Sequence, residues 1–491
     1  MMPRAQSPMP HWQSVAPGRG GVSEIERRPE HPEESRSPGS IVSLVTDERT
    51  DGLLTTIDVR GRRAADLAGI LPRPHAPGHD VRDVVGQILE RVRVDGDRAV
   101  LALTAELDGA VLESLRVPQV EIDAALGRIP AALREALEVA HRRISDYHAF
   151  EAGVGAEGGD AGEGELGGNG VRVRQLLRPV DRAGCYAPGG RARYPSSVLM
   201  CAAPARVAGV AEVVLCVPPG PDGRVDDATL AAAAIAGVDE VYAVGGAQAV
   251  GAMAYGTETI RPVDVIVGPG NRYVAEAKRQ VSGVVGIAAA FAGPSEVVVI
   301  AGPTTPARYA AVDLAVQAEH GPDGLAWLVT WSEEKAAEVL DVLGEIISSS
   351  PRRDDLEATF HSGGYACLVD DVHQALAVSN VVAPEHLELL IDDAESLLPG
   401  VRAAGAVFCG PWSPASMGDY VAGPNHVLPT DRTARFSSAL RADDFRRHLH
   451  AVTVDPAGIA ALGGHVREIA LAEGLAAHAL SIEMRAGELP S

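Results

Sequence analysis

The 491-residue sequence has few aromatic side chains and few cysteines. Phe, Trp and Tyr make up 4% of the residues, whereas hydrophobic residues make up 46%, so the core must be built from aliphatic side chains. The sequence has five cysteines, an odd number. They are widely spaced, and no two of them form a C-x-x-C motif. This usage excludes a disulfide framework and a cysteine-based zinc site, and it is typical of a reducing cytoplasm.

The chain also has fewer positive than negative side chains, and it contains no long apolar run and no targeting pattern. Its formal net charge is −23 and its pI is near 5.1, which argues against a nucleic-acid partner because such proteins present a basic surface. The sequence contains no run of 18 apolar residues and no basic-then-apolar N-terminal pattern. We therefore expect a cytoplasmic protein without a nucleic-acid or membrane partner.

The length predicts more than one domain, and the patterning divides the chain. Residues 1–50 are rich in Pro, Gly, Ser, Arg and Glu, which predicts a disordered extension. Apolar residues at helical spacing over 81–92 predict an amphipathic helix, and more helix is expected over 121–148. Residues 152–170, rich in Gly and acidic residues, are expected to form an exposed loop. The chain from about residue 442 is expected to be helical.

Beyond residue 172, short apolar runs alternate with helical stretches. This alternation predicts the α/β class, with parallel sheets and crossover helices, and the length suggests two such sheets. The predicted strands are Glu212–Val217, Glu240–Val244, Asp264–Val267, Glu296–Ile300, Ala326–Val329, Ala366–Val369 and Ala406–Phe408.

One strand–helix unit, residues 293–320, ends in a polar pair. Its helix has Pro306 in the first turn and stops before Gly321. Gln317 and His320, three residues apart, are expected on one face of the last turn. Such a pair can belong to a site, since α/β proteins build sites at the ends of these units. A histidine there can equally just complement the helix dipole.

Three glycine-rich turns follow predicted strands. In the first, Asp264–Asn271, the glycines would let the backbone approach a phosphate closely. The nucleotide fingerprint G-x-G-x-x-G is incomplete, because Tyr273 stands where Gly or Ala is required. The other two turns are Tyr186–Gly190 and Gly245–Gln248. A nucleotide site and plain tight turns both remain open.

Two short segments pair a carboxylate with an imidazole. Glu385 and His386 are adjacent, and their side-chain types are the usual general bases near neutral pH, although a structural pairing is equally open. The glycine-punctuated segment 418–426 holds Asp419 and His426, and as a bare pattern it is also typical of a solvated loop.

A third carboxylate and imidazole, Glu473 and His478, lie five residues apart in the predicted C-terminal helix. At 100° per residue they would point roughly 140° away from a common face. One metal bound by both would be strained, so we expect one residue to bind metal and the other substrate.

Together these motifs resemble the histidinol dehydrogenase family, over about Leu53 to Met484. One departure is the run Gly286–Phe291, which lacks the usual acid and has one extra residue before Ser295. The matching runs are Gly184–Gly190, Tyr194–Val198, Val267–Asn271, Ala292–Glu296, Gln317–His320, Ala383–Leu387, Gly418–Tyr420, Asn425–Thr430, Ala434–Ser438 and Glu473–His478.

The resemblance implies roles for particular residues. Glu385 and His386 match the catalytic pair. The implied zinc ligands are Gln317, His320, Asp419 and His478. The implied substrate contacts, beside those ligands, are Ser295, His386, His426 and Glu473. The implied contacts to a nicotinamide cofactor are Tyr186, Gln248 and Asn271.

The family's activity is the four-electron oxidation of L-histidinol to L-histidine through histidinaldehyde, with NAD and one zinc ion per subunit. The resemblance implies this activity, with His386 taking the alcohol proton and Glu385 activating water. It also implies a homodimer whose C-terminal segment reaches the partner's site.

The resemblance further implies two incomplete Rossmann-like domains with parallel sheets, plus small N- and C-terminal helical segments. The expected boundaries are 1–50 for the extension, 51–182 with 296–441 for the first domain, 183–295 for the cofactor-contacting domain, and 442–491 for the C-terminal segment.

Three alternatives remain. A related family oxidises sulfonated diols on the same scaffold, but its substrate has no imidazole, and the surroundings of Glu473 and His478 are intact here. A zinc hydrolase would use Glu385 and His386 on water and would form no NADH. A non-catalytic binding protein would have lost ligands or bases, and none is lost.

Overall fold

The computed structural model describes residues 49–50, 53–72, 81–153, 164–189, 193–288, 293, 295–319, 321 and 324–488. Nearly all of the predicted N-terminal extension lies outside the described residues, and so does His320.

The first sheet has seven strands in the order β1-β2-β12-β11-β10-β13-β14. All neighbours are parallel except β1 and β2. After β10 the chain adds β11 and β12 on one side and then β13 and β14 on the other, so the strand order reverses beside β10. The strands are β1 Arg49–Thr50, β2 Leu54–Asp58, β10 Glu296–Ala301, β11 Leu325–Thr330, β12 Gly364–Leu368, β13 His386–Leu390 and β14 Ala406–Cys409.

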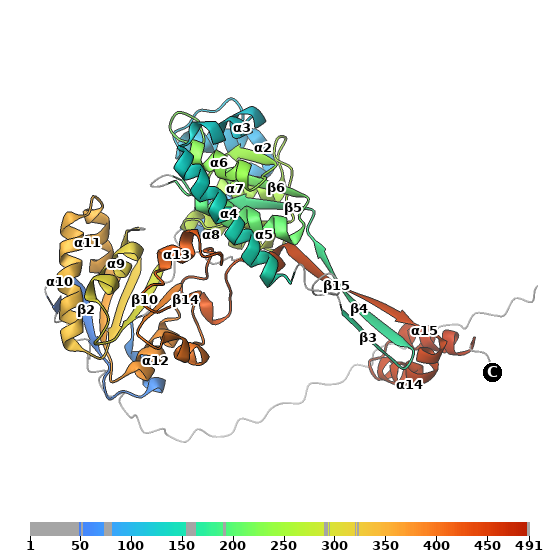
Figure 1. The fold of residues 1–491 in the computed structure, drawn as a ribbon. Coiled ribbons are helices and arrows are strands. Elements are labelled where there is room, and N and C mark those ends of the chain that lie inside the picture. Colours follow the sequence, from blue (N-terminus) through green and yellow to red (C-terminus); the bar gives the residue numbers. More distant parts are fainter. Residues whose placement is uncertain are drawn as a thin grey trace, which may run out of the picture. The chain divides into compact units, whose positions relative to one another are not determined.

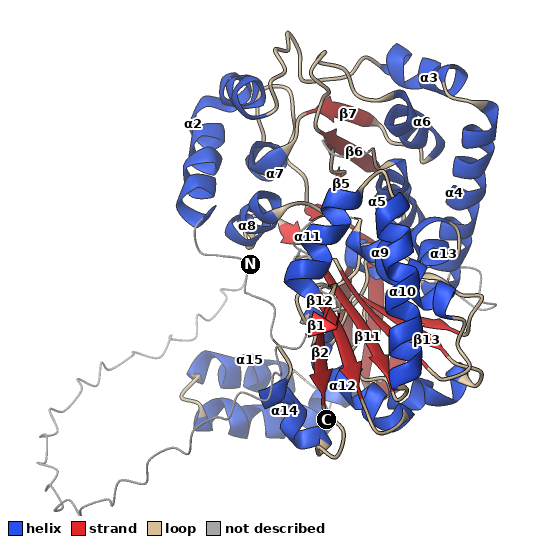
Figure 2. Ribbon diagram, turned by 90° about the vertical axis from the view of Figure 1, so that its left-hand side faces the viewer, coloured by secondary structure: helices blue, strands red, loops and turns tan. Residues whose placement is uncertain are grey.

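Helices cover both faces of this sheet. α9, α10 and α11 lie over one face (Figure 2) and share an apolar cluster that includes Val297, Leu314 and Leu390. The other face packs on α1 and α12 through Leu387 and Val378. The helices are α1 Leu67–Ile70, α9 Ala307–Ala318, α10 Glu333–Ser349, α11 Arg353–Gly363, α12 Val372–Val382 and α13 Ala415–Tyr420.

The second sheet has five parallel strands in the order β7-β6-β5-β8-β9, and its order reverses at β5. One apolar cluster joins it to α3, α4, α5 and α6, and another joins it to α2, α7 and α8. Its strands are β5 Arg182–Tyr186, β6 Glu212–Val217, β7 Glu240–Ala243, β8 Val265–Val267 and β9 Gly286–Ile287. Its helices are α2 Arg82–Leu107, α3 Gln119–Arg128, α4 Ala131–Glu151, α5 Pro195–Ala208, α6 Asp227–Ile235, α7 Gly246–Tyr255 and α8 Arg272–Val281.

The remaining strands form an antiparallel ribbon, β15-β4-β3, that leads into the helix pair α14–α15 (Figure 1). Its strands are β3 Gly164–Gly168, β4 Val171–Pro179 and β15 Arg446–Val454. The two helices are α14 Pro456–Ala472 and α15 Ala476–Ala486, and they pack on each other.

The predicted α/β class with two parallel sheets is confirmed, and each of the seven predicted strands is present. Two local predictions are wrong. Residues 164–168 form a strand of the ribbon, not a loop. The stretch after residue 442 is not helical throughout, because β15 pairs with β4 before α14 begins. None of the described helices is both long enough and apolar enough to cross a membrane.

Candidate active site

The predicted catalytic pair lies where β10 and β13 begin. His386 is the first residue of β13 and pairs in register with Val297, so Glu385 lies beside Ser295 and Glu296. The Glu385 carboxylate accepts a hydrogen bond from the Glu296 backbone N–H at 3.1 Å and another from the Ser295 side chain. Glu385 and His386 are both buried, so their charges are held away from bulk water.

His386 lies between two carboxylates. Its Nδ1 is 3.7 Å from Glu385 Oε2, and its Nε2 is 3.4 Å from Asp419 Oδ1. Burial raises the pKa of Glu385 to about 7, and the attraction of His386 opposes a larger rise. Burial alone would lower the pKa of His386, but Glu385 and Asp419 outweigh it and raise that pKa to about 9. Both pKa values are therefore closer to neutral pH than to the extremes, and groups with such pKa values are efficient in proton transfer near pH 7.

The pair is at the amino edge of the seven-stranded sheet. Ligands of open α/β sheets usually bind at the carboxyl ends of strands. Here Glu385 and Ser295 both precede their strands. Because α9 follows β10 and runs back across the sheet, its C-terminal end also returns to the amino edge. The helix therefore delivers Gln317 to the edge that carries the catalytic pair.

Gln317 is in the last turn of α9 and is 3% exposed, unusually buried for a polar amide. α9 ends at Ala318, and the predicted position of His320 beside Gln317 lies outside the described residues. The end of α13 lies nearby, because the carboxylates of Asp419 and Glu319 add to burial in raising the pKa of the Tyr420 hydroxyl. Asp419, the neighbour of Tyr420, is thereby at the same edge as Gln317.

His426 connects this edge with the other sheet. Its Nδ1 is 2.8 Å from the Asp419 carbonyl oxygen, so Nδ1 carries the hydrogen that it donates. Its Nε2 is 3.2 Å from Ser197 Oγ, in the first turn of α5. The neighbouring Asn425 donates to the Met200 carbonyl of the same helix at 2.6 Å. The segment 425–426 thus ties the catalytic edge to the helix that follows β5.

The three predicted cofactor residues all follow strands of the five-stranded sheet, at its carboxyl edge. Tyr186 ends β5, and its hydroxyl accepts a hydrogen bond from the Gly246 N–H at 3.1 Å. Gln248 is fully buried in the first turn of α7. Asn271 caps α8 by accepting from the Tyr273 and Val274 N–H groups. Tyr186 and Gln248 are therefore buried beneath the glycine turns and support their backbone.

The turn after β8 passes beside the end of β5. A Cβ on Gly268 would lie 2.0 Å from the Tyr186 carbonyl oxygen, and its φ of +105° also requires glycine. The strand order reverses between β5 and β8, and such switch points are where dinucleotides bind in this class of sheet. The glycine cradle and the α8 N-terminus therefore fit a nicotinamide dinucleotide.

Glu296 is a site residue that the sequence reasoning placed only as the start of a strand. It is 1% exposed, and its Oε1 accepts from the Asp431 N–H at 3.2 Å. Burial, then the charge of Glu385, raises its pKa to about 8. A single acid at the head of the run Val-Val-Val-Ile was the signal available in the sequence.

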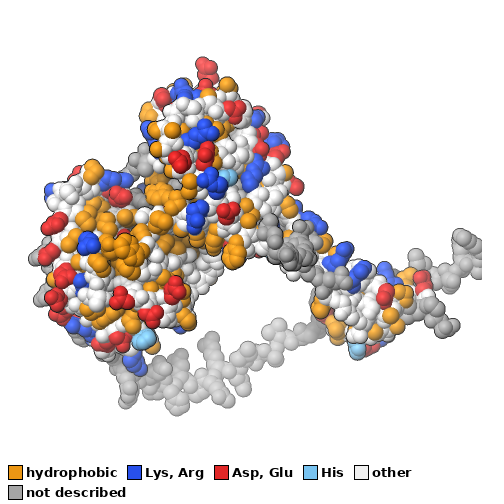
Figure 3. All heavy atoms as spheres, in the orientation of Figure 1, with side chains coloured by type: hydrophobic (Ala, Val, Ile, Leu, Met, Phe, Trp, Pro, Cys, Tyr) orange, Lys and Arg blue, Asp and Glu red, His pale blue; other side chains and the backbone are white. Residues whose placement is uncertain are grey.

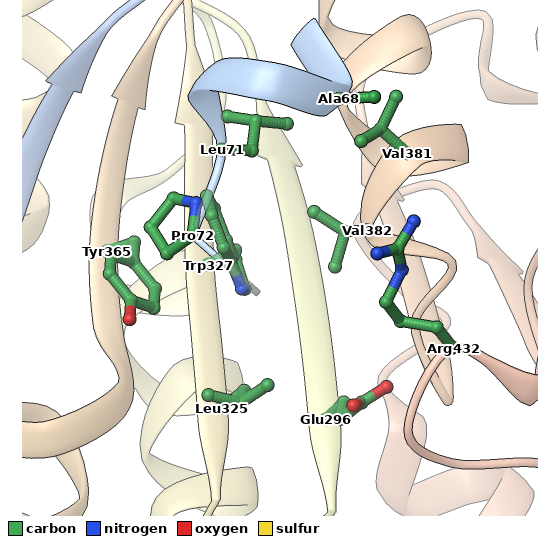
Figure 4. A pocket seen from close by; sticks show the side chains of 10 residues that line it. All are labelled: Ala68, Leu71, Pro72, Glu296, Leu325, Trp327, Tyr365, Val381, Val382 and Arg432. Carbon is green, nitrogen blue, oxygen red and sulfur yellow. The ribbon is translucent and has the colours of Figure 1, made fainter. Parts of the chain in front are cut away.

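Behind Glu296 lies a cavity of about 10 Å³, which Trp327 and Tyr365 also line (Figure 4). Glu296 and Arg432 are at one end of it and Leu71 is at the other (Figure 4). A space of this size holds about one water molecule, so it is too small for a substrate or a cofactor.

The positions of Glu473 and His478 differ from the predicted single helix. They are not on one helix, because Glu473 follows the end of α14, Gly474 turns with a φ of +73°, and His478 belongs to α15. Both are exposed. The part of the chain that the structure describes contains no group of three His, Cys, Asp or Glu side chains able to hold a metal. Among the described residues, His478 is therefore not grouped with Asp419.

The donor types still fit a zinc ion. Gln317 and Asp419 supply oxygen atoms at one edge, and the implied set adds two imidazoles, His320 and His478. His320 lies outside the described residues, and His478 is on a separate helix pair. Ser295, Glu385, His386, Asp419 and His426 are the predicted site residues that the described contacts bring together.

Comparison with known proteins identifies the family of the chain. Residues 71–486 match the family model described as histidinol dehydrogenase. The chain is 45% identical over 406 residues to a histidinol dehydrogenase of Parasynechococcus marenigrum, covering 83% of this chain and 91% of that protein. It is 47% identical over 404 residues to one of Aromatoleum aromaticum, covering 82% and 90% respectively.

A solved structure is also similar. The histidinol dehydrogenase of Elizabethkingia anophelis has a TM-score of 0.83 and 33% sequence identity, and the match covers 90% of this chain and 99% of that one. The resemblance seen in the motifs is thus confirmed. This chain belongs to the histidinol dehydrogenase family of oxidoreductases.

Proposed function

We propose that the protein oxidises L-histidinol to L-histidine through histidinaldehyde, with NAD as hydride acceptor and zinc as cofactor. The observation that carries the proposal is the cluster of Glu385, His386 and Asp419 at one sheet edge, tied by His426 to the helix behind the cofactor turns. The cluster provides two bases with shifted pKa values beside a ligand pair suited to a metal.

The chain's residues would divide the proton transfers. His386 would take the alcohol proton as hydride leaves the substrate carbon. Glu385 would take a proton from the water that adds to the aldehyde. His386 would then take the hydroxyl proton of the hydrated aldehyde as the second hydride leaves. His386 shares Asp419 with the implied metal site, and a cation there would favour the neutral imidazole that a base requires.

Each cofactor has one task in this scheme. Zinc, when bound, would coordinate the imidazole and amine of the substrate and so fix its orientation. NAD, when bound at the turns after β5, β7 and β8, would accept the hydride. Ser295 would hold the Glu385 carboxylate in place through its hydrogen bond. Ser295, His426 and Glu473 are proposed to contact the substrate.

We also propose a homodimer in which the C-terminal segment of one chain completes the partner's site. Hydrophobic side chains gather over α9 and α13 (Figure 3), where Trp412 is 83% exposed and Tyr420 is 57% exposed. The α14–α15 pair also exposes apolar residues, with Ile469 at 61% and Met484 at 64%. Large exposed apolar surfaces mark interfaces. Exchange would bring Glu473 and His478 to a site that lacks them in one chain.

The domain division proposed with this function keeps the boundaries expected from the sequence, although α2, α3 and α4 pack on the five-stranded sheet. Residues 51–182 and 296–441 would form the substrate-side domain, 183–295 the cofactor domain, and 442–491 the exchanged segment. The five cysteines are all free, which suits the cytoplasmic location expected from the sequence.

The decisive experiment is NADH absorbance with histidinol, measured before and after chelator treatment. We expect NADH formation that chelator abolishes and added zinc restores. A sulfonated diol that reacts faster than histidinol would favour the related dehydrogenase. Water-dependent cleavage of an ester or amide without NADH would favour the hydrolase, although the dinucleotide-type turns argue against it.

A further inference from the structure

A second pair of carboxyl groups lies one layer below the catalytic edge. Asp313 on α9 and Glu388 on β13 are 6% and 0% exposed, and their carboxyl groups lie close enough for Asp313 to raise the cost of ionising Glu388. Two buried carboxylates this close repel each other when both are ionised, so the arrangement favours a state in which one keeps a proton and donates it to the other. Burial, then Asp313, raises the pKa of Glu388 to about 9, which agrees with a retained proton.

Glu388 also reaches a third element. Its Oε1 accepts a hydrogen bond of 3.0 Å from the backbone N–H of Ala415, the first residue of α13. The first N–H groups of a helix have no partner within it, so this bond satisfies a group that would otherwise be buried alone. One carboxyl pair therefore joins α9, β13 and α13.

Each joined element carries a site residue close by. Asp313 precedes Gln317 by four residues on α9, and Ala415 precedes Asp419 by four residues on α13, so each pair shares a helix face. Glu388 follows His386 by two residues on β13 and shares its side of the sheet. A shift of any of these elements would move a ligand or a base.

The one bond to Ala415 accounts for part of the stability of the fold, but stability alone does not explain the pair. It lies in the layer of Val299, Leu314 and Leu390, where a polar group loses its hydration. Replacing buried polar pairs with well-packed apolar residues is often neutral or stabilising for a fold. The pair is therefore expected to serve the arrangement of the elements more than their stability.

We propose that Asp313 and Glu388 are positioning residues. Their hydrogen bond, with that of Ala415, holds α9, β13 and α13 in register and so fixes the site residues these elements carry. The proposal rests on the proposed zinc-dependent oxidation, because it assigns the pair to the geometry of that site.

The test compares zinc affinity, measured by competition with a chromogenic chelator, with melting temperature and with kcat and KM for histidinol. The variants of the full-length protein are Asp313→Leu with Glu388→Leu, Asp313→Ala, Asp313→Asn and, as matched control, Ser379→Ala. Ser379 is an equally buried polar residue on α12, which covers the opposite face of the same sheet.

The double leucine variant leaves the Ala415 N–H without its acceptor, so it is expected to fold but to melt somewhat below the wild-type temperature. Its zinc affinity and kcat should each fall by about 10–100-fold, as when outer-shell partners of metal ligands are removed. Asp313→Ala should show the same losses. Asp313→Asn should recover most of them, because its amide donates in place of the shared proton. Ser379→Ala should match the wild type.

Two results would overturn the proposal. One is a folded double leucine variant with the zinc affinity of the Ser379→Ala control. The other, which decides the matter if the double variant does not fold, is an Asp313→Asn protein that loses as much as Asp313→Ala. A wild-type protein that binds zinc but forms no NADH from histidinol would refute the proposed function, while the zinc comparison would still test the positioning role.

Discussion

Replacing Glu385 by Gln keeps the size of the side chain and removes its basicity. The amide can still accept hydrogen bonds from the Glu296 N–H and from Ser295, so the turn before β13 should keep its shape. Of the two half-reactions, only the aldehyde step consumes water. The substitution should therefore slow aldehyde oxidation selectively.

Two magnitudes follow. Loss of a general base typically lowers a rate by about 10²–10⁴-fold, and we expect the aldehyde step of Glu385→Gln to fall within that range. Burial raises the pKa of Glu385 to about 7, so the active carboxylate becomes populated as pH rises through neutrality. Its population is roughly one tenth at pH 6 and roughly nine tenths at pH 8. The wild-type aldehyde step should thus accelerate about tenfold over this interval.

The assay is single-turnover NADH formation, started separately from histidinol and from histidinaldehyde across this pH range. In Glu385→Gln the aldehyde trace should be slow and should lose its pH dependence near neutrality. The first hydride transfer from histidinol should change much less. His386→Asn is the matched comparison, because it should slow both steps.

Two outcomes would refute this reasoning. Equal losses for both substrates in Glu385→Gln would show that Glu385 does not belong specifically to the water step. No loss for either substrate would show that the residue only shapes the turn that presents His386.

Three further predictions test the site and its assembly. His478→Ala should lose zinc and activity together, and full zinc occupancy with normal turnover, by metal analysis and NADH assay, would remove His478 from the ligand set. The His386→Ala chain and the His478→Ala chain are each expected to be inactive. When the two are mixed and subunit exchange is verified, part of the activity should return, because one site of the mixed dimer carries neither defect. If no activity returns, each site is built from one chain. Burial raises the pKa of Glu296 to about 8, above its value in an unfolded chain, so its contribution to stability is complete at acidic pH and is lost as pH rises toward 8. Glu296→Gln should therefore gain stability over the wild type by up to a few kcal/mol between pH 5 and pH 8.5 in chemical denaturation, and a difference that does not vary with pH would contradict the buried, protonated carboxyl.

Local patterning was sufficient for most elements of the two sheets. Runs such as Glu212–Val217 are short, rich in β-branched residues and bounded by turns, so their state depends little on distant parts of the chain. The adjacent pair Glu385 and His386 was likewise found from residue type alone. The family motifs then indicated the roles of residues scattered from Tyr186 to His478.

Long-range pairing decided what local patterning missed. β15 forms because Arg446–Val454 pairs with Val171–Pro179, a partner far away in the sequence, although the alternation of Val452, Thr453 and Val454 was a usable strand signal. Gly474, in the left-handed conformation, ends one helix between Glu473 and His478. The helical pattern of the sequence continues through both residues, so the break could not be seen in it.

The position and support of the site are also tertiary properties. The sequence was sufficient to propose which residues carry the chemistry, because residue type and motif spacing are local. Only the folded chain places them at the amino edge of the sheet, because α9 runs back against β10 and returns Gln317 to the start of β13. Only folding brings Asp313 against Glu388, because no local period relates a helix position to a strand that enters the sheet much later in the chain.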